Sequence, residues 1–170
     1  MAVYTVADSR TPLDLQVQFN KSLDFAASTD VASGTAGASL QSLSEVTIFA
    51  RVKALGSSTG RIFNKGAGST GRFALACDGN TFKFIAGWTG VGQWRTAAGS
   101  RKGGDWQDII VKYSYSATTN DPTFYIDGVK QNVLGQDVAP TGSASTDDAN
   151  YYIGNRSAAN AGFLGKVQNI

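Results

Sequence analysis

Apolar and polar residues alternate with a period of two along much of this chain, and this alternation predicts β-strands. The clearest example is the segment 13–19, in which four apolar residues alternate with Asp, Gln and Gln. The segments 46–52 and 109–115 follow the same rule. Because successive side chains of a strand point to opposite sides, each segment has one apolar face to bury against a second layer. A helical period of 3.6 is not sustained over a dozen residues anywhere, so the pattern favours an all-β protein.

Turn residues separate these segments at the spacing of a β-sandwich. Asp127-Gly128 lies between two strand-like runs, and Asp78-Gly79-Asn80 lies between two others. Asp-Gly supplies the positive φ angles that a tight hairpin needs. We therefore predict about ten short strands that form a two-sheet antiparallel β-sandwich. The segment 26–39 is rich in Ser, Thr, Ala and Gly and predicts a long surface loop.

The length of 170 residues suits one domain with a full core. We divide it into an N-terminal strand or arm at 1–20 and a β-sandwich domain at 21–170. The arm carries the alternating segment described above, and we expect it to complete or extend a sheet edge.

Short motifs in a fixed order resemble the laminin-G-like, concanavalin-A-like family from about residue 22 to the C-terminus. The motifs are Ile62-Phe63-Asn64-Lys65-Gly66, Trp106 followed by Asp108-Ile109-Ile110-Val111, Tyr125-Ile126-Asp127-Gly128, Tyr152-Ile153-Gly154 and Gly165-Lys166-Val167. The resemblance implies a jelly-roll sandwich of the concanavalin-A-like kind that binds or builds more often than it catalyses. Arg51 replaces an aromatic residue of the family pattern, and Gln168 and Asn169 replace an acidic pair.

Charge and composition argue against several classes of partner. The net charge is +2, and the longest basic run is Arg101-Lys102, whereas a surface that follows phosphates needs clustered cations. No apolar run approaches the ~20 residues of a membrane-spanning helix. The N-terminus lacks the pattern of a secretory signal. We expect neither a nucleic-acid nor a membrane partner. Cys77 is the only cysteine, so we expect no internal disulfide and an inert buried thiol.

Residue types needed for catalysis are scarce in this chain. Glycoside hydrolases of this fold use paired carboxylates, usually glutamates, but Glu45 is the only glutamate here. The chain has no histidine, which excludes a Ser-His-Asp triad. We expect a protein that is not an enzyme, with an all-aspartate hydrolase as the remaining catalytic alternative.

Trp88, Gln93, Trp94 and Arg95 form the best candidate for a ligand site. Exposed tryptophans stack on the apolar faces of sugar rings, while Gln93 and Arg95 could hydrogen-bond hydroxyl groups. In the alternative interpretation Trp88 packs in the core and Trp94 covers a sheet edge. Both interpretations stay open at this point.

Oxygen-bearing side chains also gather at Asp147, Asp148 and Asn150, with Asn155 nearby. Calcium takes six to eight oxygen ligands, and related domains often hold a calcium ion near such loops. The alternative is that these side chains are simply solvated. Apart from this calcium hypothesis, no cofactor is expected.

Two functions agree with these observations. The first is a virion surface component, such as a capsid decoration or head-fibre protein, whose arm pairs with a neighbouring virion protein or with another copy of the chain. This interpretation explains a β-domain made without a signal peptide. The second is a carbohydrate-binding module or lectin, on a virion or in an extracellular or cell-surface setting, that binds glycans through the aromatic segment.

Overall fold

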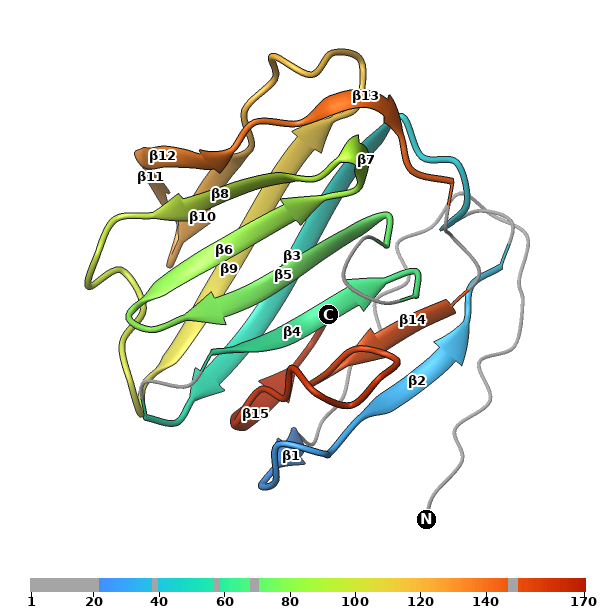
Figure 1. Ribbon diagram of the computed structural model, residues 1–170. Helices are drawn as coiled ribbons and strands as arrows, with labels where there is room; N and C mark the ends of the chain where they lie inside the picture. Colours follow the sequence, from blue (N-terminus) through green and yellow to red (C-terminus); the bar gives the residue numbers. More distant parts are fainter. Residues whose placement is uncertain (1–21, 38–39, 57–58, 68–70, 147–149) are drawn as a thin grey trace.

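The computed structural model describes residues 22–37, 40–56, 59–67, 71–146 and 150–170, and β-strands form its regular structure (Figure 1). Within these ranges no helix is long and apolar enough to cross a membrane. The strands are β1 (Leu23–Phe25), β2 (Ala32–Thr35), β3 (Glu45–Ala54), β4 (Gly60–Lys65), β5 (Phe73–Asp78), β6 (Thr81–Ala86), β7 (Trp88–Gly90), β8 (Gly92–Thr96), β9 (Trp106–Ser114), β10 (Thr123–Ile126), β11 (Val129–Gln131), β12 (Val133–Val138), β13 (Thr141–Ala144), β14 (Asn150–Ile153) and β15 (Gly165–Gln168).

These strands build two stacked antiparallel sheets. The six-stranded sheet has the order β1-β15-β3-β9-β10-β11, and the seven-stranded sheet has the order β12-β8-β6-β5-β4-β14-β2. A two-stranded sheet, β13-β7, lies at one end (Figure 1). The predicted all-β, two-sheet sandwich is confirmed.

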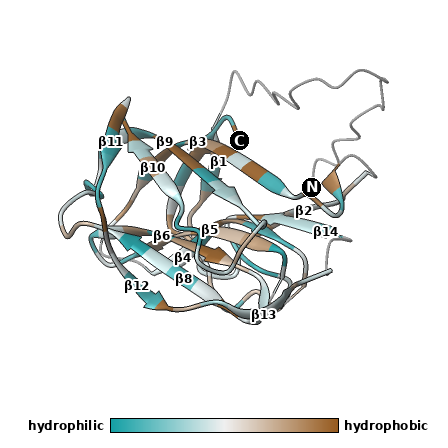
Figure 2. Cartoon of the chain, turned by 90° about the horizontal axis from the view of Figure 1, so that it is seen from above, coloured by the Kyte–Doolittle hydropathy of each residue, from teal (hydrophilic) through white to brown (hydrophobic). Residues whose placement is uncertain are grey.

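The core fills the space between the two sheets, which Figure 2 shows one above the other. In β3 the inward residues Val46, Ile48, Ala50, Val52 and Ala54 are buried and alternate with more exposed residues. The seven-stranded sheet contributes the inward side chains of β5, β6 and β8 to the same core, among them Leu75, Cys77, Phe82, Phe84 and Trp94, each 0% exposed. The period-two pattern of the sequence therefore corresponds to one face toward this core.

Both predicted hairpins form. Asp127 and Gly128 have φ angles of 51° and 79°, and the Asp127 carboxylate accepts a hydrogen bond of 2.9 Å from the backbone N–H of Asp108. Gly79 has a φ of 59° in the hairpin between β5 and β6, where the Thr81 hydroxyl donates to the carbonyl of Asp78 at 2.8 Å. Asp127 is therefore a turn residue, as the sequence predicts.

The predicted loop at 26–39 is wrong in part, because it contains the edge strand β2, which pairs with β14. Small residues leave β2 without an apolar pattern, but they allow close packing. A Cβ atom at Gly34 would lie 2.4 Å from the Tyr151 hydroxyl oxygen. The arm at 1–20 lies outside the described residues.

Cys77 agrees with the prediction of an inert thiol. It is 0% exposed, and burial raises the pKa of its thiol to about 12. The thiolate that would react is therefore almost unpopulated at neutral pH.

On the outer face of the six-stranded sheet, Arg51 takes the place of the aromatic residue of the family pattern. Its guanidinium lies 3.3 Å from the Asp108 carboxylate and 5.9 Å from the centroid of the partly exposed Trp106 ring. Arg51 is thus a partly exposed cation on the side of the sandwich opposite the seven-stranded sheet.

Candidate ligand-binding groove on the seven-stranded sheet

Outward side chains of the seven-stranded sheet line up in rows across its strands. Arg61, Ala76, Lys83 and Arg95 occupy paired positions on β4, β5, β6 and β8. A neighbouring row consists of Asn64, Ala74, Ile85 and Gln93. The register of β4 shifts between Arg61 and Phe63, and this bulge returns Asn64 to the outer face beside Arg61.

A groove of about 410 Å³ opens over these rows. The small side chain of Ala76 lies in its floor, between the longer Arg61 and Lys83. Val91 and Gln93 line it at one side, and Arg156 and Asn160, from the loop 154–164, line it at the other. The hollow exists because β5 presents alanine where its neighbours present long side chains.

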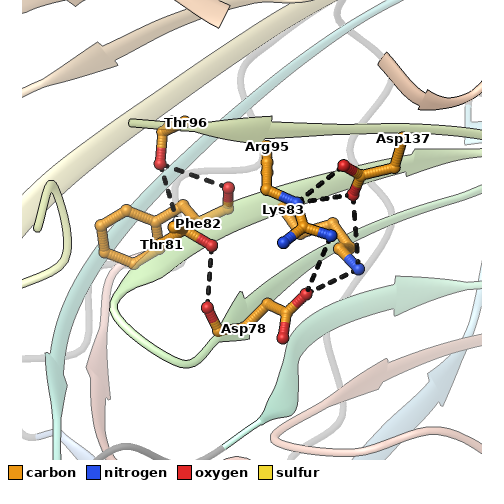
Figure 3. Close-up of polar contacts among 7 residues, drawn as sticks. All are labelled: Asp78, Thr81, Phe82, Lys83, Arg95, Thr96 and Asp137. Carbon is orange, nitrogen blue, oxygen red and sulfur yellow. Dashed lines mark hydrogen bonds and ion pairs between the residues drawn. The ribbon is translucent and has the colours of Figure 1, made fainter. Parts of the chain in front are cut away.

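Four charged side chains cross-link one end of the groove (Figure 3). Lys83 Nζ lies 2.7 Å from an Asp78 carboxylate oxygen and 3.6 Å from one of Asp137. Arg95 Nε lies 2.7 Å from the other Asp137 oxygen, and its Nη2 lies 3.9 Å from Asp78. Two cations and two carboxylates therefore neutralise one another there.

The hydrogen bond from Lys83 is the largest of the effects that lower the pKa of Asp78, ahead of the opposing effect of its partial burial. The charged Asp78 therefore stabilises the fold at pH values above 3.8, the ordinary pKa of an aspartate. This contribution is lost as the pH falls through the lowered pKa of Asp78. We expect the free energy of unfolding of Asp78→Asn to fall less steeply toward acid pH than that of the wild type. The difference should be less than about 1 kcal/mol, because the ion pair is partly solvated. Urea unfolding at several pH values between neutral and pH 2 would measure this. An acid side identical to that of the wild type would contradict it.

Asn155 fixes the loop that forms the opposite wall. It is 0% exposed, and its side-chain N–H groups donate to the carbonyls of Ser28 at 2.9 Å and Asp30 at 3.2 Å. Its side-chain oxygen accepts from the backbone N–H groups of Arg156 and Ala161, both at 3.0 Å. One buried amide thus holds the loop at both ends of its turn.

Close backbone contact brings this loop against β4. Arg61 donates its backbone N–H to the Ala161 carbonyl at 2.8 Å. A Cβ atom at Gly60 would lie 2.2 Å from the Gly162 carbonyl oxygen, so glycine is needed at this contact. The contact places Arg156 and Asn160 beside Arg61.

The structure corrects the predicted tryptophan platform. Trp94 is 0% and Trp88 7% exposed, and their rings pack between the sheets against Tyr113 and Tyr115, at centroid distances of 5.2 and 5.7 Å. Their indole N–H groups are also satisfied internally. Trp94 donates to Asp121 at 2.7 Å, and Trp88 donates to the Tyr113 hydroxyl at 3.0 Å. Neither ring face is available to a sugar.

The two polar residues of the same prediction lie elsewhere. Gln93 and Arg95 alternate with Trp94 along β8 and therefore point outward, Gln93 into the groove and Arg95 to its charged end. Three further residues of the groove, Arg61, Lys83 and Arg156, were not predicted from the sequence. Alternation within β6 would have placed Lys83 on the outer face, but nothing in the sequence brings the loop of Arg156 to β4.

The calcium hypothesis stays untested for two of its residues, since Asp147 and Asp148 lie outside the described residues. Asn150 begins β14 and pairs with Thr35 of β2. Asn155 is not available as a ligand, because its oxygen already accepts two N–H groups. Across the described ranges, no three residues of the types His, Cys, Asp or Glu cluster in a way that could hold a metal ion.

A family model described as the concanavalin A-like lectin/glucanases superfamily matches residues 25–170. No curated protein matches the sequence. Among solved structures, the Ruminococcus gnavus IT-sialidase CBM40 bound to α2,3-sialyllactose is similar at a TM-score of 0.59 and 12% identity, over 91% of this chain and 86% of that one. Mouse laminin α1 chain domains LG4-5 are similar at 0.57 and 14%, over 87% of this chain and 40% of that one. At such identities the likeness shows the fold.

Proposed function

This chain belongs to the concanavalin A-like lectin/glucanases superfamily, and within it we propose a carbohydrate-binding module that binds saccharides in the groove of its seven-stranded sheet. The observation that carries the proposal is the hollow over Ala76, which is lined by both hydrogen-bonding and apolar side chains. The fold shared with CBM40, a module solved with a bound saccharide, supports the choice of ligand class.

The size and lining of the groove suit a saccharide. Ligand pockets are commonly about 300–1,000 Å³ in volume, and this one has about 410 Å³. Gln93 and Asn160 offer amide donors and acceptors for hydroxyl groups, while Ile85 and Val91 offer apolar surface for the C–H faces of a sugar ring. These side chains lie on strands and on a loop that buried hydrogen bonds hold in place.

Binding without cleavage agrees with the carboxylates of the groove. A glycosidase needs one carboxylic acid whose pKa is raised, so that it stays protonated and can protonate the leaving group. The pKa of Asp78 is lowered instead, and Asp137 is paired with Arg95 and Lys83. Both carboxylates therefore serve as partners of cations, and neither has the environment of a general acid.

The replacement Ala76→Leu tests the groove directly. An outward leucine would fill the floor between Arg61 and Lys83 without changing the charge, so we expect saccharide binding to fall more than tenfold while the fold remains. A glycan array identifies the ligand, and calorimetric titration with that ligand measures the loss. Ala98→Leu, at an exposed position outside the groove, is the matched control. Unchanged affinity in a folded Ala76→Leu variant would place the site elsewhere.

The role as a virion surface component stays a prediction. Assembly through the N-terminal arm also stays a prediction, because residues 1–20 lie outside the described residues. Saccharide binding is compatible with a virion surface and with an extracellular or cell surface. Calcium at Asp147, Asp148 and Asn150 also stays a prediction.

A further inference from the structure

We propose that the end of the groove formed by Arg61 and Arg156 binds the anionic group, a carboxylate or a sulfate, of an acidic saccharide. This inference rests on the proposed function, because it names the class of saccharide that the same groove takes. Two arginines from different elements meet there, one from β4 and one from the loop 154–164.

Arg61 is a buried cation whose bonding is incomplete. It is 8% exposed, and one of its terminal nitrogens, Nη1, donates to the Asn64 side-chain oxygen at 3.3 Å. A guanidinium has five N–H donors, so most of its capacity is not used by this contact. Its side chain lines the groove, toward which a ligand could bring acceptors.

Arg156 adds a second positive charge to the same place. Its Nε donates to the Asn160 side-chain oxygen at 2.6 Å, which directs the side chain along the groove wall. Burial is the main effect that lowers the pKa of Arg61 to about 10, and the nearby charge of Arg156 is the second, so Arg61 stays charged at neutral pH. The fold therefore holds two like charges near each other, and an anion between them would relieve their repulsion.

The two ends of the groove differ in how their cations are compensated. At the other end, Lys83 and Arg95 are paired with Asp78 and Asp137 (Figure 3). In the part of the chain that the structure describes, no carboxylate forms an ion pair with Arg61 or Arg156. The uncompensated charge is thus local to one end, where planar guanidinium groups suit the bidentate geometry of carboxylate and sulfate oxygens.

The groove around this end indicates a saccharide as the carrier of the anion. Asn160 and Gln93 lie within the same lining and would meet hydroxyl groups while the arginines hold the charge. A free inorganic anion would use the arginines alone, so the two sources of anion are separable by experiment.

Matched ligands test the inference. An oligogalacturonate and its methyl ester share one sugar backbone and differ in charge, and a sulfated galactan oligosaccharide and its desulfated form do the same for sulfate. Calorimetric titration of the full chain at constant ionic strength would compare each pair. We expect the wild type to prefer at least one acidic member about tenfold or more over its neutral partner, as charge-assisted hydrogen bonds predict. Arg156→Gln should remove this preference, because it takes away one of the two guanidinium groups that hold the anion.

Arg51→Gln is the control, because it removes one positive charge from the opposite face of the sandwich. The Arg51→Gln variant should still prefer the acidic saccharides over the neutral ones. It has the same net charge as Arg156→Gln, so the comparison separates a local contact from an effect of net charge. Equal affinity of the wild type for the acidic and neutral members of both pairs would overturn the inference. Retention of the preference in Arg156→Gln would also overturn it. Either result leaves the proposed function intact if neutral saccharides still bind and Ala76→Leu weakens that binding more than tenfold.

Titration with sodium sulfate covers the case in which none of these saccharides binds. The side-chain Nε–H signals of Arg61 and Arg156 would be followed by ¹⁵N NMR, with sodium chloride at matched ionic strength as the reference. A saturable shift of the Arg61 signal in the wild type that is absent in Arg156→Gln supports the anion site, even if the proposed function fails. The absence of a sulfate-specific shift in the wild type would overturn the inference.

Discussion

The replacement Trp94→Ala is expected to lower the free energy of unfolding by about 3–5 kcal/mol, the usual cost of truncating a large buried aromatic residue. Trp94 is 0% exposed and contacts Phe84 and Tyr113, with ring centroids 6.2 and 5.2 Å away. Its removal would leave a cavity between the sheets and leave Asp121 without the indole N–H that it accepts at 2.7 Å. Urea unfolding, followed by circular dichroism, would measure the loss.

Two further variants separate the ring from its hydrogen bond. Trp94→Phe keeps an aromatic ring in the core but removes the donor to Asp121, so we expect a smaller loss. Asp121→Asn keeps an acceptor for the indole and should cost least. A Trp94→Ala variant as stable as the wild type, or one that loses saccharide affinity without losing stability, would contradict a core role for Trp94.

The replacement Asn155→Ala is expected to lower the free energy of unfolding by about 3 kcal/mol. Each buried polar group left without a partner costs about 1–3 kcal/mol, and some of the former partners of Asn155 would bind water instead. It removes four hydrogen bonds, two donated to the carbonyls of Ser28 and Asp30 and two accepted from backbone N–H groups. The loop that carries Arg156 would lose its anchor. We therefore expect thermal unfolding at a lower temperature together with weaker binding in the groove.

Asn155→Asp provides a second comparison, since it keeps the accepting oxygen but turns a buried, charged acceptor toward the carbonyls of Ser28 and Asp30. We expect it to cost at least as much stability as alanine, because acceptor faces acceptor without a proton between them. Ala158→Ser, at an exposed position of the same loop, should leave stability and binding unchanged. Full stability of Asn155→Ala would show that the close contact between Gly60 and Gly162 is enough to hold the loop.

Strands with an alternating apolar face could be predicted from the sequence, and β3 and β9 are the clearest cases. Asp-Gly and Asp-Gly-Asn gave two hairpins because their residue types fit the turn geometry. β2 could not be predicted, since an edge strand of Ala, Ser, Gly and Thr buries little apolar surface and carries no pattern. The tryptophans of β7 and β8 were uncertain because alternation separates Trp94 from Gln93 and Arg95 without saying which face is inner.

The groove itself was beyond prediction from the sequence for a different reason. Its floor depends on the pairing of Ala76 with Arg61 and Lys83, which are distant in the chain or lie across a hairpin. Its wall depends on a loop whose position is set by Asn155. Sequence reasoning placed residues on a face in each strand, but the register between strands and the path of the loop come from tertiary contacts.

Lys83 projects outward between Phe82 and Phe84, both of which are 0% exposed in the interior. The buried rings of these two neighbours fix the backbone on both sides of Lys83. The backbone of Lys83 therefore cannot shift without disturbing the packing of the aromatic residues. The groove floor is consequently preorganised. If it binds a saccharide as proposed, little entropy would be lost in ordering the groove on binding. Substitutions at outward positions could then change selectivity while the architecture that presents them stays the same.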